Sequence, residues 1–90
     1  GGTVETKPVL ADGQRLSVNT NALNGELRAE ILDTEGNPIP GYGLEACLPI
    51  DGDGVRQVVS WKMQDRLPSS GYVQIRWHLH CASFYSYAIS

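Results

Sequence analysis

The sequence predicts an all-β fold: a single antiparallel two-sheet sandwich, jelly-roll or Ig-like, with roughly six to eight strands. Apolar side chains recur at every second position along much of the chain, which is the period of a strand that buries one face. Clusters of glycine, proline, asparagine and aspartate separate these alternating stretches. The 90 residues are the length of one domain, so we expect residues 1–90 to form one sandwich module.

The first third of the chain contains three predicted strands. Residues 3–7 are β-prone, and residues 15–20 and 27–32 each place apolar residues on one face. Asn24 and Gly25 form a dipeptide that is typical of two-residue hairpin turns. We therefore expect residues 15–20 and 27–32 to be the arms of a β-hairpin, with a helix over residues 21–32 as the alternative.

The middle third is rich in turn residues. Residues 33–38 and 40–43 are predicted turns, and residues 44–54 are predicted to be a long connection. After this connection, residues 55–61 form another predicted strand. Its inward face consists of Val55, Val59 and Trp61.

Residues 72–80 show the most regular alternation in the chain. The inward set is Val73, Ile75, Trp77 and Leu79, and the outward set is Tyr72, Gln74, Arg76, His78 and His80. Residues 84–89 are the last predicted strand. Trp61 and Trp77 are the largest candidates for the core, since each tryptophan buries on the order of 200 Å².

Composition and charge exclude several classes of protein. The net charge is −3 and the seven lysines and arginines are scattered, whereas a nucleic-acid interface needs concentrated positive charge. No apolar stretch approaches the roughly 20 residues of a membrane-spanning helix. The chain begins with Gly1 and Gly2 and not with methionine, so we expect a mature product or an excised module.

The two cysteines, Cys47 and Cys81, leave two alternatives open. In the first alternative they form one disulfide, which would stabilise the fold by about 4 kcal/mol in the chain-entropy estimate. Otherwise they are separate buried thiols that behave as small apolar residues.

An ordered set of motifs runs through nearly the whole chain. It consists of Thr6-Lys7-Pro8, Leu16-x-Val18-Asn19, Gly25-x-Leu27-Arg28-x-Glu30-Ile31-x-Asp33-x-x-Gly36-x-Pro38-Ile39-x-Gly41, Asp53, Val59-x-Trp61-Lys62, Val73-x-Ile75-Arg76 and Phe84-Tyr85-Ser86-Tyr87. This set resembles the C-terminal β-sandwich modules of large secreted bacterial proteins, many of which carry glycosidase-like or sialidase-like catalytic domains. The resemblance implies an extracellular, non-catalytic accessory module, with carbohydrate binding as the usual role. In such modules the position of Cys81 is commonly polar, so its cysteine departs from the pattern.

Metal and catalytic sites are weakly indicated. His78 and His80 lie on one side of a predicted strand and can share a metal only with further ligands, so two surface histidines are the favoured interpretation. Asp51 and Asp53 resemble the opening of a calcium loop, but no closing carboxylate follows, which favours an acidic turn. We predict no cofactor, with a structural calcium as the weaker alternative. No motif frames a serine nucleophile, so we predict no catalytic residue and no enzyme.

The best candidate for a ligand-binding surface is the outward face of residues 72–80. Aromatic rings stack on sugar faces and planar polar groups hydrogen-bond to hydroxyls in pairs. Tyr42 in its loop, and Tyr85 and Tyr87 if the last strand lies alongside, are further candidates. The alternative is that these side chains form ordinary cross-strand pairs, such as Arg76 with Glu30.

Two functions follow from this sequence. The first is a non-catalytic, carbohydrate-binding accessory module of a secreted multidomain protein, whose partners are a polysaccharide or glycan and neighbouring domains. The second is a structural or self-assembling subunit that pairs with copies of itself through edge strands at residues 3–7 and 84–89. Residues 84–89 contain no charge and no proline, which favours such pairing.

Overall fold

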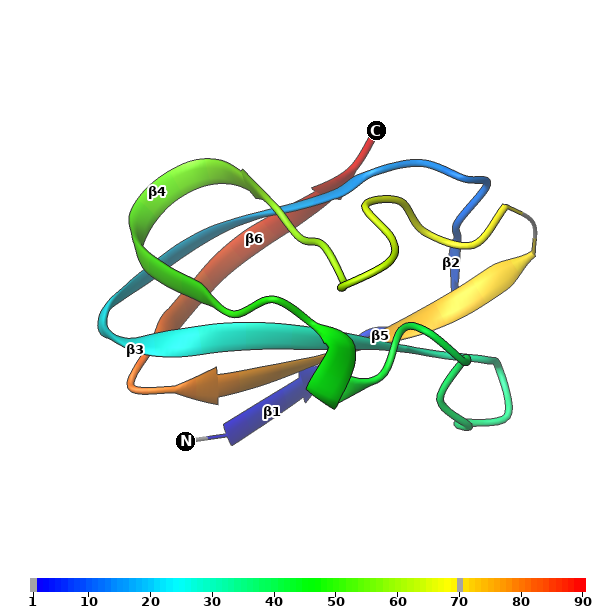
Figure 1. Cartoon of the computed structure of the whole chain (residues 1–90), viewed down its shortest axis with the longest axis horizontal. Coiled ribbons are helices and arrows are strands. Elements are labelled where there is room, and N and C mark those ends of the chain that lie inside the picture. The colour runs from blue at the N-terminus through cyan, green and yellow to red at the C-terminus, as the bar shows by residue number, and fades with distance from the viewer. Residues whose placement is uncertain (1, 70) are drawn as a thin grey trace.

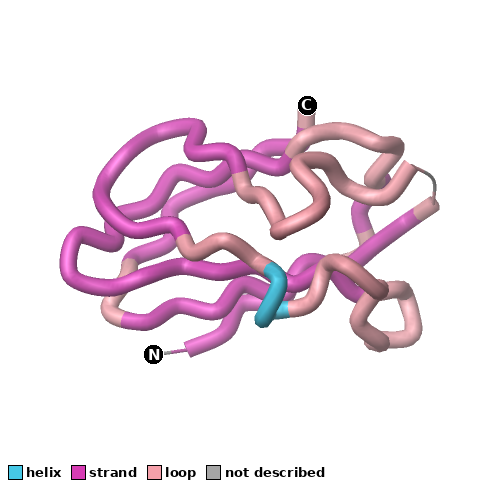
Figure 2. Tube along the Cα trace, viewed as in Figure 1, coloured by secondary structure: helices cyan, strands magenta, loops and turns pink. Residues whose placement is uncertain are grey.

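The computed structural model of the chain describes residues 2–69 and 71–90, without the side chains of residues 23, 24, 53 and 55. In chain order its elements are β1 (Gly2–Glu5), β2 (Val9–Leu10), β3 (Leu16–Leu32), the 3₁₀ turn η1 (Leu44–Ala46), β4 (Ile50–Val58), β5 (Tyr72–His80) and β6 (Ser83–Ile89). The all-β prediction is confirmed, because the described residues contain strands and one 3₁₀ turn but no α-helix (Figure 2). The described part of the chain therefore contains no helix that is long and apolar enough to cross a membrane.

Strand β3 is the centre of a six-stranded antiparallel sheet. It pairs with β4 on one side and with β5 and β6 on the other, while β1 and β2 pair with β5. Figure 1 shows the sheet curling so that the beginning of β3 lies above its end, with a bend joining them at the left of the view. The two separate stacked sheets that the sequence predicted are not confirmed. The structure has one curled sheet, a half-barrel, whose two halves face each other.

The predicted hairpin at Asn24 and Gly25 is wrong, because β3 runs through both positions. Gly25 packs against the corner between β5 and β6. A Cβ there would overlap the carbonyl oxygen of His80 and lie 2.7 Å from the Cβ of Cys81. The glycine therefore permits a close approach of two backbones and does not make a turn. A register shift between Ala22 and Leu27 in the pairing with β4 marks the bend.

Strands β5 and β6 pair with consecutive parts of β3. Glu26 lies opposite His80 at the end of β5, and Asn21 lies opposite Ser83 at the start of β6. Between them Cys81 has a left-handed backbone with φ of 52°. The bend in β3 and the junction of β5 with β6 therefore lie side by side, and the sheet folds over at this level (Figure 1).

The core lies between the facing halves of the sheet. Nine inward residues of β3 and β5 are no more than 1% exposed: Leu16, Val18, Thr20, Leu27, Ala29, Ile31, Val73, Ile75 and Trp77. Leu79 is partly buried against this core. The prediction that Trp61 and Trp77 are core residues is confirmed. Both faces of β5 therefore follow the predicted alternation.

The predicted loop over residues 44–54 and strand over residues 55–61 are both displaced. Strand β4 covers Ile50–Val58, so the Asp51–Gly54 turn sequence lies within a strand. Gly52 pairs with Ala22 and has φ of 96°, which lets the strand follow the bend of β3. Pairing with a neighbouring strand overrides the local turn composition here. Val59 and Trp61 are buried beyond the end of β4, and the predicted inward side chain of Val55 lies outside the described residues.

The disulfide between Cys47 and Cys81 is not formed, and both cysteines are free thiols. Cys47 is buried, where its Sγ accepts a hydrogen bond from the backbone N–H of Ala29 at 3.3 Å. Burial raises the pKa of this thiol. Cys81 is exposed at the junction of β5 and β6. Cys47 thus follows the predicted alternative of a buried apolar thiol, whereas Cys81 follows neither alternative.

Candidate functional site

The outward side chains of β5 form one row on the convex face of the sheet. Tyr72, at the start of the strand, is 61% exposed, and His80, at its end, is also exposed. Gln74, Arg76 and His78 lie between them and are partly exposed. The structure therefore places these five predicted ligand-binding residues together on an open surface.

Glu30 on β3 fixes the middle of this row. It lies opposite Arg76 in the strand register and is only 8% exposed. Its Oε1 is 3.2 Å from Nη1 of Arg76 and 2.8 Å from Nε2 of His78. One largely buried carboxylate therefore orients two planar nitrogen-bearing groups.

A second carboxylate approaches Arg76 from the opposite strand. Glu5 on β1 lies opposite Arg76, and its Oε2 is 3.3 Å from Nε of the guanidinium. The side chains of Arg76 and Glu5 are 35% and 44% exposed, so water screens the attraction and its contribution to stability is small. The alternative interpretation that Arg76 pairs with Glu30 is confirmed. The two ion pairs together hold the guanidinium of Arg76 between Glu5 on β1 and Glu30 on β3.

The two ends of the row differ in character. Tyr72 lies opposite Leu10 of β2, and both are strongly exposed, so one end is apolar. Next to it, the Gln74 amide donates to the carbonyl oxygen of Thr6 at 3.4 Å. His80 lies opposite Glu26 at the other end. The surface therefore runs from a stacking platform to a polar, ionisable end.

The tyrosines outside β5 do not join this row. Strand β6 pairs with β3, so Tyr85 is exposed on a different part of the sheet. Tyr87 turns inward, with its ring centroid 5.9 Å from that of Trp77. Tyr42 is also buried, because it packs edge-on against Trp61 and its hydroxyl donates to the carbonyl oxygen of Arg66 at 2.8 Å. Tyr42 and Tyr87 are therefore unsuited to stacking on a ligand.

The metal candidates whose side chains the structure describes do not form a site together. His78 is engaged by Glu30, and Asp51 is exposed on β4, while the side chain of Asp53 lies outside the described residues. Within the described part of the chain, no three histidine, cysteine, aspartate or glutamate residues are grouped so as to hold an ion. The calcium suggested for Asp51 and Asp53 remains a prediction.

No protein family, curated protein or solved structure matches this chain. The grounds for a function are therefore the surface of the molecule and the resemblance noted in its sequence. The partnership of Glu5 with Arg76 is the part of that surface that sequence reasoning missed. Glu5 stands in an alternating strand, so a search for acidic residues on neighbouring strands would have found the pair.

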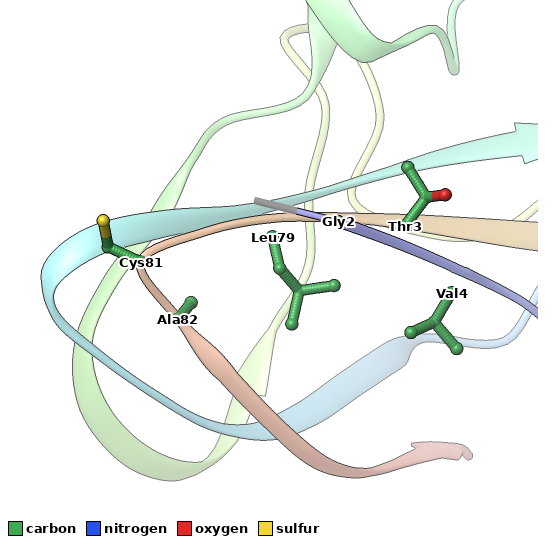
Figure 3. A pocket seen from close by; sticks show the side chains of 6 residues that line it. All are labelled: Gly2, Thr3, Val4, Leu79, Cys81 and Ala82. Carbon is green, nitrogen blue, oxygen red and sulfur yellow. The ribbon is translucent and has the colours of Figure 1, made fainter.

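Sequence reasoning also missed an apolar hollow of about 340 Å³ beside β1. Its lining consists of Gly2, Thr3, Val4, Leu79, Cys81 and Ala82. Figure 3 shows Val4 and Leu79 pointing to one side of the strands, with Thr3 and the thiol of Cys81 pointing to the other. This hollow is lined mainly by aliphatic groups, so it offers few hydrogen bonds to a polar ligand.

Proposed function

We propose that this chain is a non-catalytic accessory module that binds carbohydrate through the outer face of β5 and its neighbours. The observation that carries the proposal is the row formed by Tyr72, Arg76 and His78, in which Glu30 holds the last two side chains in position. Planar groups that are already oriented lose little entropy when they hydrogen-bond to sugar hydroxyls. An open face is suited to a polysaccharide chain that passes across it.

The resemblance to secreted bacterial modules supports the rest of the proposal. We take the chain to be an extracellular part of a larger multidomain protein, working without a cofactor. We also take the curled sheet to be a variant of the jelly-roll or Ig-like sandwich of those modules. Its facing halves enclose a shared core, as the two sheets of a sandwich do.

The absence of catalysis is part of the proposal. A glycosidase uses two carboxyl groups that flank the bond to be cleaved. Three carboxylates lie beside the row: Glu5 and Glu30 both pair with Arg76, and Glu26 pairs with Arg28. Such pairing favours a positioning role for them over acid–base chemistry.

The test is a binding titration of the chain against a panel of neutral and acidic polysaccharides. Replacing Tyr72 with alanine removes the exposed platform and leaves the core intact, so we expect affinity to fall by about 2- to 10-fold with no loss of stability. Met63→Ala is the matched control, since Met63 is 87% exposed and lies in a loop away from β5. Failure of every polysaccharide to bind at millimolar concentration would contradict the proposal.

A second candidate function is assembly through edge strands. The observation that favours it is β6, which has neither charge nor proline and pairs with β3 along one edge. No described strand pairs with its other edge, so those backbone groups are free to add a strand. Sedimentation at increasing concentration tests this candidate. Dimers or polymers that Tyr85→Lys disrupts would support it, whereas a monomer at every concentration would rule it out.

A further inference from the structure

The second half of the sheet carries a separate hollow on its outer face. Here β3 lies between β4 and β6, and Ser17 lies opposite Val58 on one side and Ala88 on the other. Because the central side chains are small, the surface is hollowed into two adjoining depressions of about 310 and 180 Å³. Together they are lined by Arg15, Ser17, Asn19, Arg56, Val58, Ser86, Tyr87, Ala88 and Ser90. We refer to them as the Arg15–Arg56 groove.

Two unneutralised cations line this groove. Arg15 and Arg56 are both exposed, and neither guanidinium forms an ion pair or a side-chain hydrogen bond within the described part of the chain. By contrast, Arg28 and Arg76 on the other half of the sheet both pair with glutamates. Among the described side chains that line the groove, none is acidic. The groove therefore presents two positive side chains on a chain whose net charge is −3.

The position of Arg56 is fixed by the fold. Its backbone is left-handed, with φ of 54°, which is uncommon for a residue other than glycine. Its N–H donates to Oδ1 of Asn19 at 2.8 Å, and Nδ2 of Asn19 donates to Oγ of Ser86 at 2.9 Å. One asparagine thus links the three strands of the groove and sets the backbone from which Arg56 projects. Such conformations persist where the surroundings hold them, and they concentrate at functional sites.

We propose that the Arg15–Arg56 groove binds a single oxyanion, namely a sulfate, phosphate or carboxylate group carried by a small polar ligand. A guanidinium presents paired N–H donors that match the oxygens of such groups. The hydroxyl of Ser17, between the two arginines in the lining, supplies a further donor. The negative net charge disfavours a long polyanion, so recognition of one anionic group is the fitting case. This site is separate from the proposed carbohydrate face, and neither proposal depends on the other.

The test is an NMR titration of the ¹⁵N-labelled chain at constant ionic strength balanced with sodium chloride. The probes are sodium sulfate, methyl glucuronide and, as the neutral control, methyl glucoside. We expect saturable shifts of the amides of Ser17, Asn19 and Arg56 with an anionic probe and none with methyl glucoside. Response to sulfate alone assigns the site to sulfate or phosphate esters, and response to glucuronide assigns it to carboxylates.

Variants identify the groups responsible. Arg15→Gln and Arg56→Gln should each weaken binding about tenfold, because each removes a charge-assisted pair of hydrogen bonds. Lys62→Gln is the matched control, since it removes the same charge from an exposed loop outside the groove. Arg15 lies outside the strands, just before β3. If Arg56→Gln disturbs β4, the binding measured for Arg15→Gln is therefore sufficient to test the proposal. Absence of saturable shifts with both anions, equal shifts with methyl glucoside, or binding that both arginine variants leave unchanged would overturn the proposal.

Discussion

Replacing Gly25 with alanine tests why β3 bends where the sequence predicts a turn. The added Cβ would overlap the carbonyl oxygen of His80 and lie 2.7 Å from the Cβ and 2.8 Å from the carbonyl oxygen of Cys81. These atoms belong to or adjoin the opposite backbone, so no side-chain rotation relieves the contact and the strands must separate. Overpacking lowers the free energy of unfolding by about 1–3 kcal/mol. We expect a loss near the upper end of this range, because the added Cβ meets backbone atoms that cannot rotate away.

Thermal and urea unfolding measure this cost. At roughly 4–8 °C per kcal/mol for a domain of this size, about 3 kcal/mol lowers the Tm by about 10–25 °C. Gly2→Ala is the control, because no atom lies within 4 Å of its added Cβ, and it should change stability by less than about 0.5 kcal/mol. Gly25→Asn distinguishes a turn from a close approach of two backbones. Asparagine suits a hairpin turn, but its Cβ meets the same obstruction as that of alanine, so we expect a similar loss of stability. Stability unchanged in both Gly25 variants would refute the account of the bend.

Three further predictions concern the two tryptophans and the two cysteines. In urea unfolding, Trp61→Phe should destabilise the chain by about 1–2 kcal/mol more than Trp77→Phe. The reason is that Trp61 Nε1 donates to the carbonyl oxygen of Ala29 at 3.0 Å, whereas Trp77 Nε1 has no partner among the described residues. Equal losses of stability in the two variants would contradict this. Burial raises the pKa of the Cys47 thiol, so the unfolded chain ionises first and the unfolding free energy should fall as the pH rises above about 8.5. Cys47→Ala should reduce this slope, and an unchanged slope would show that other groups cause it. Under native conditions a thiol reagent should modify the exposed Cys81 before Cys47, as peptide mass analysis can establish.

The alternation of apolar residues was sufficient to predict the faces of β5 but not the path of the chain. Strand β5 has the predicted bounds and faces because each residue sits on a regular strand. In β3 the apolar residues that face the core lie at even-numbered positions up to Ala22 and at odd-numbered positions from Leu27 to Ile31. A turn or a bulge produces the same change of phase. Whether the chain turns or bends at Gly25 depends on packing against His80 and Cys81, which lie far away in the sequence.

The candidate site was predictable to the same extent. The outward row of β5 follows from the alternation, whereas the pairing of Arg76 with Glu5 required the register between β1 and β5. The Arg15–Arg56 groove likewise required the pairing of β3 with β4. Tyr42 stands in a sequence rich in turn residues, but Trp61, 19 positions later, packs on its ring and buries it. Local composition carries no information about such distant partners.

The location of the bound glycan on the labelled chain tests the central proposal most directly. On addition of a polysaccharide that binds, we expect the largest amide shifts at Tyr72, Arg76 and His78, and at Thr3, which lies opposite His78 on β1. Shifts confined to β6, or no shift with any member of the panel, would contradict it.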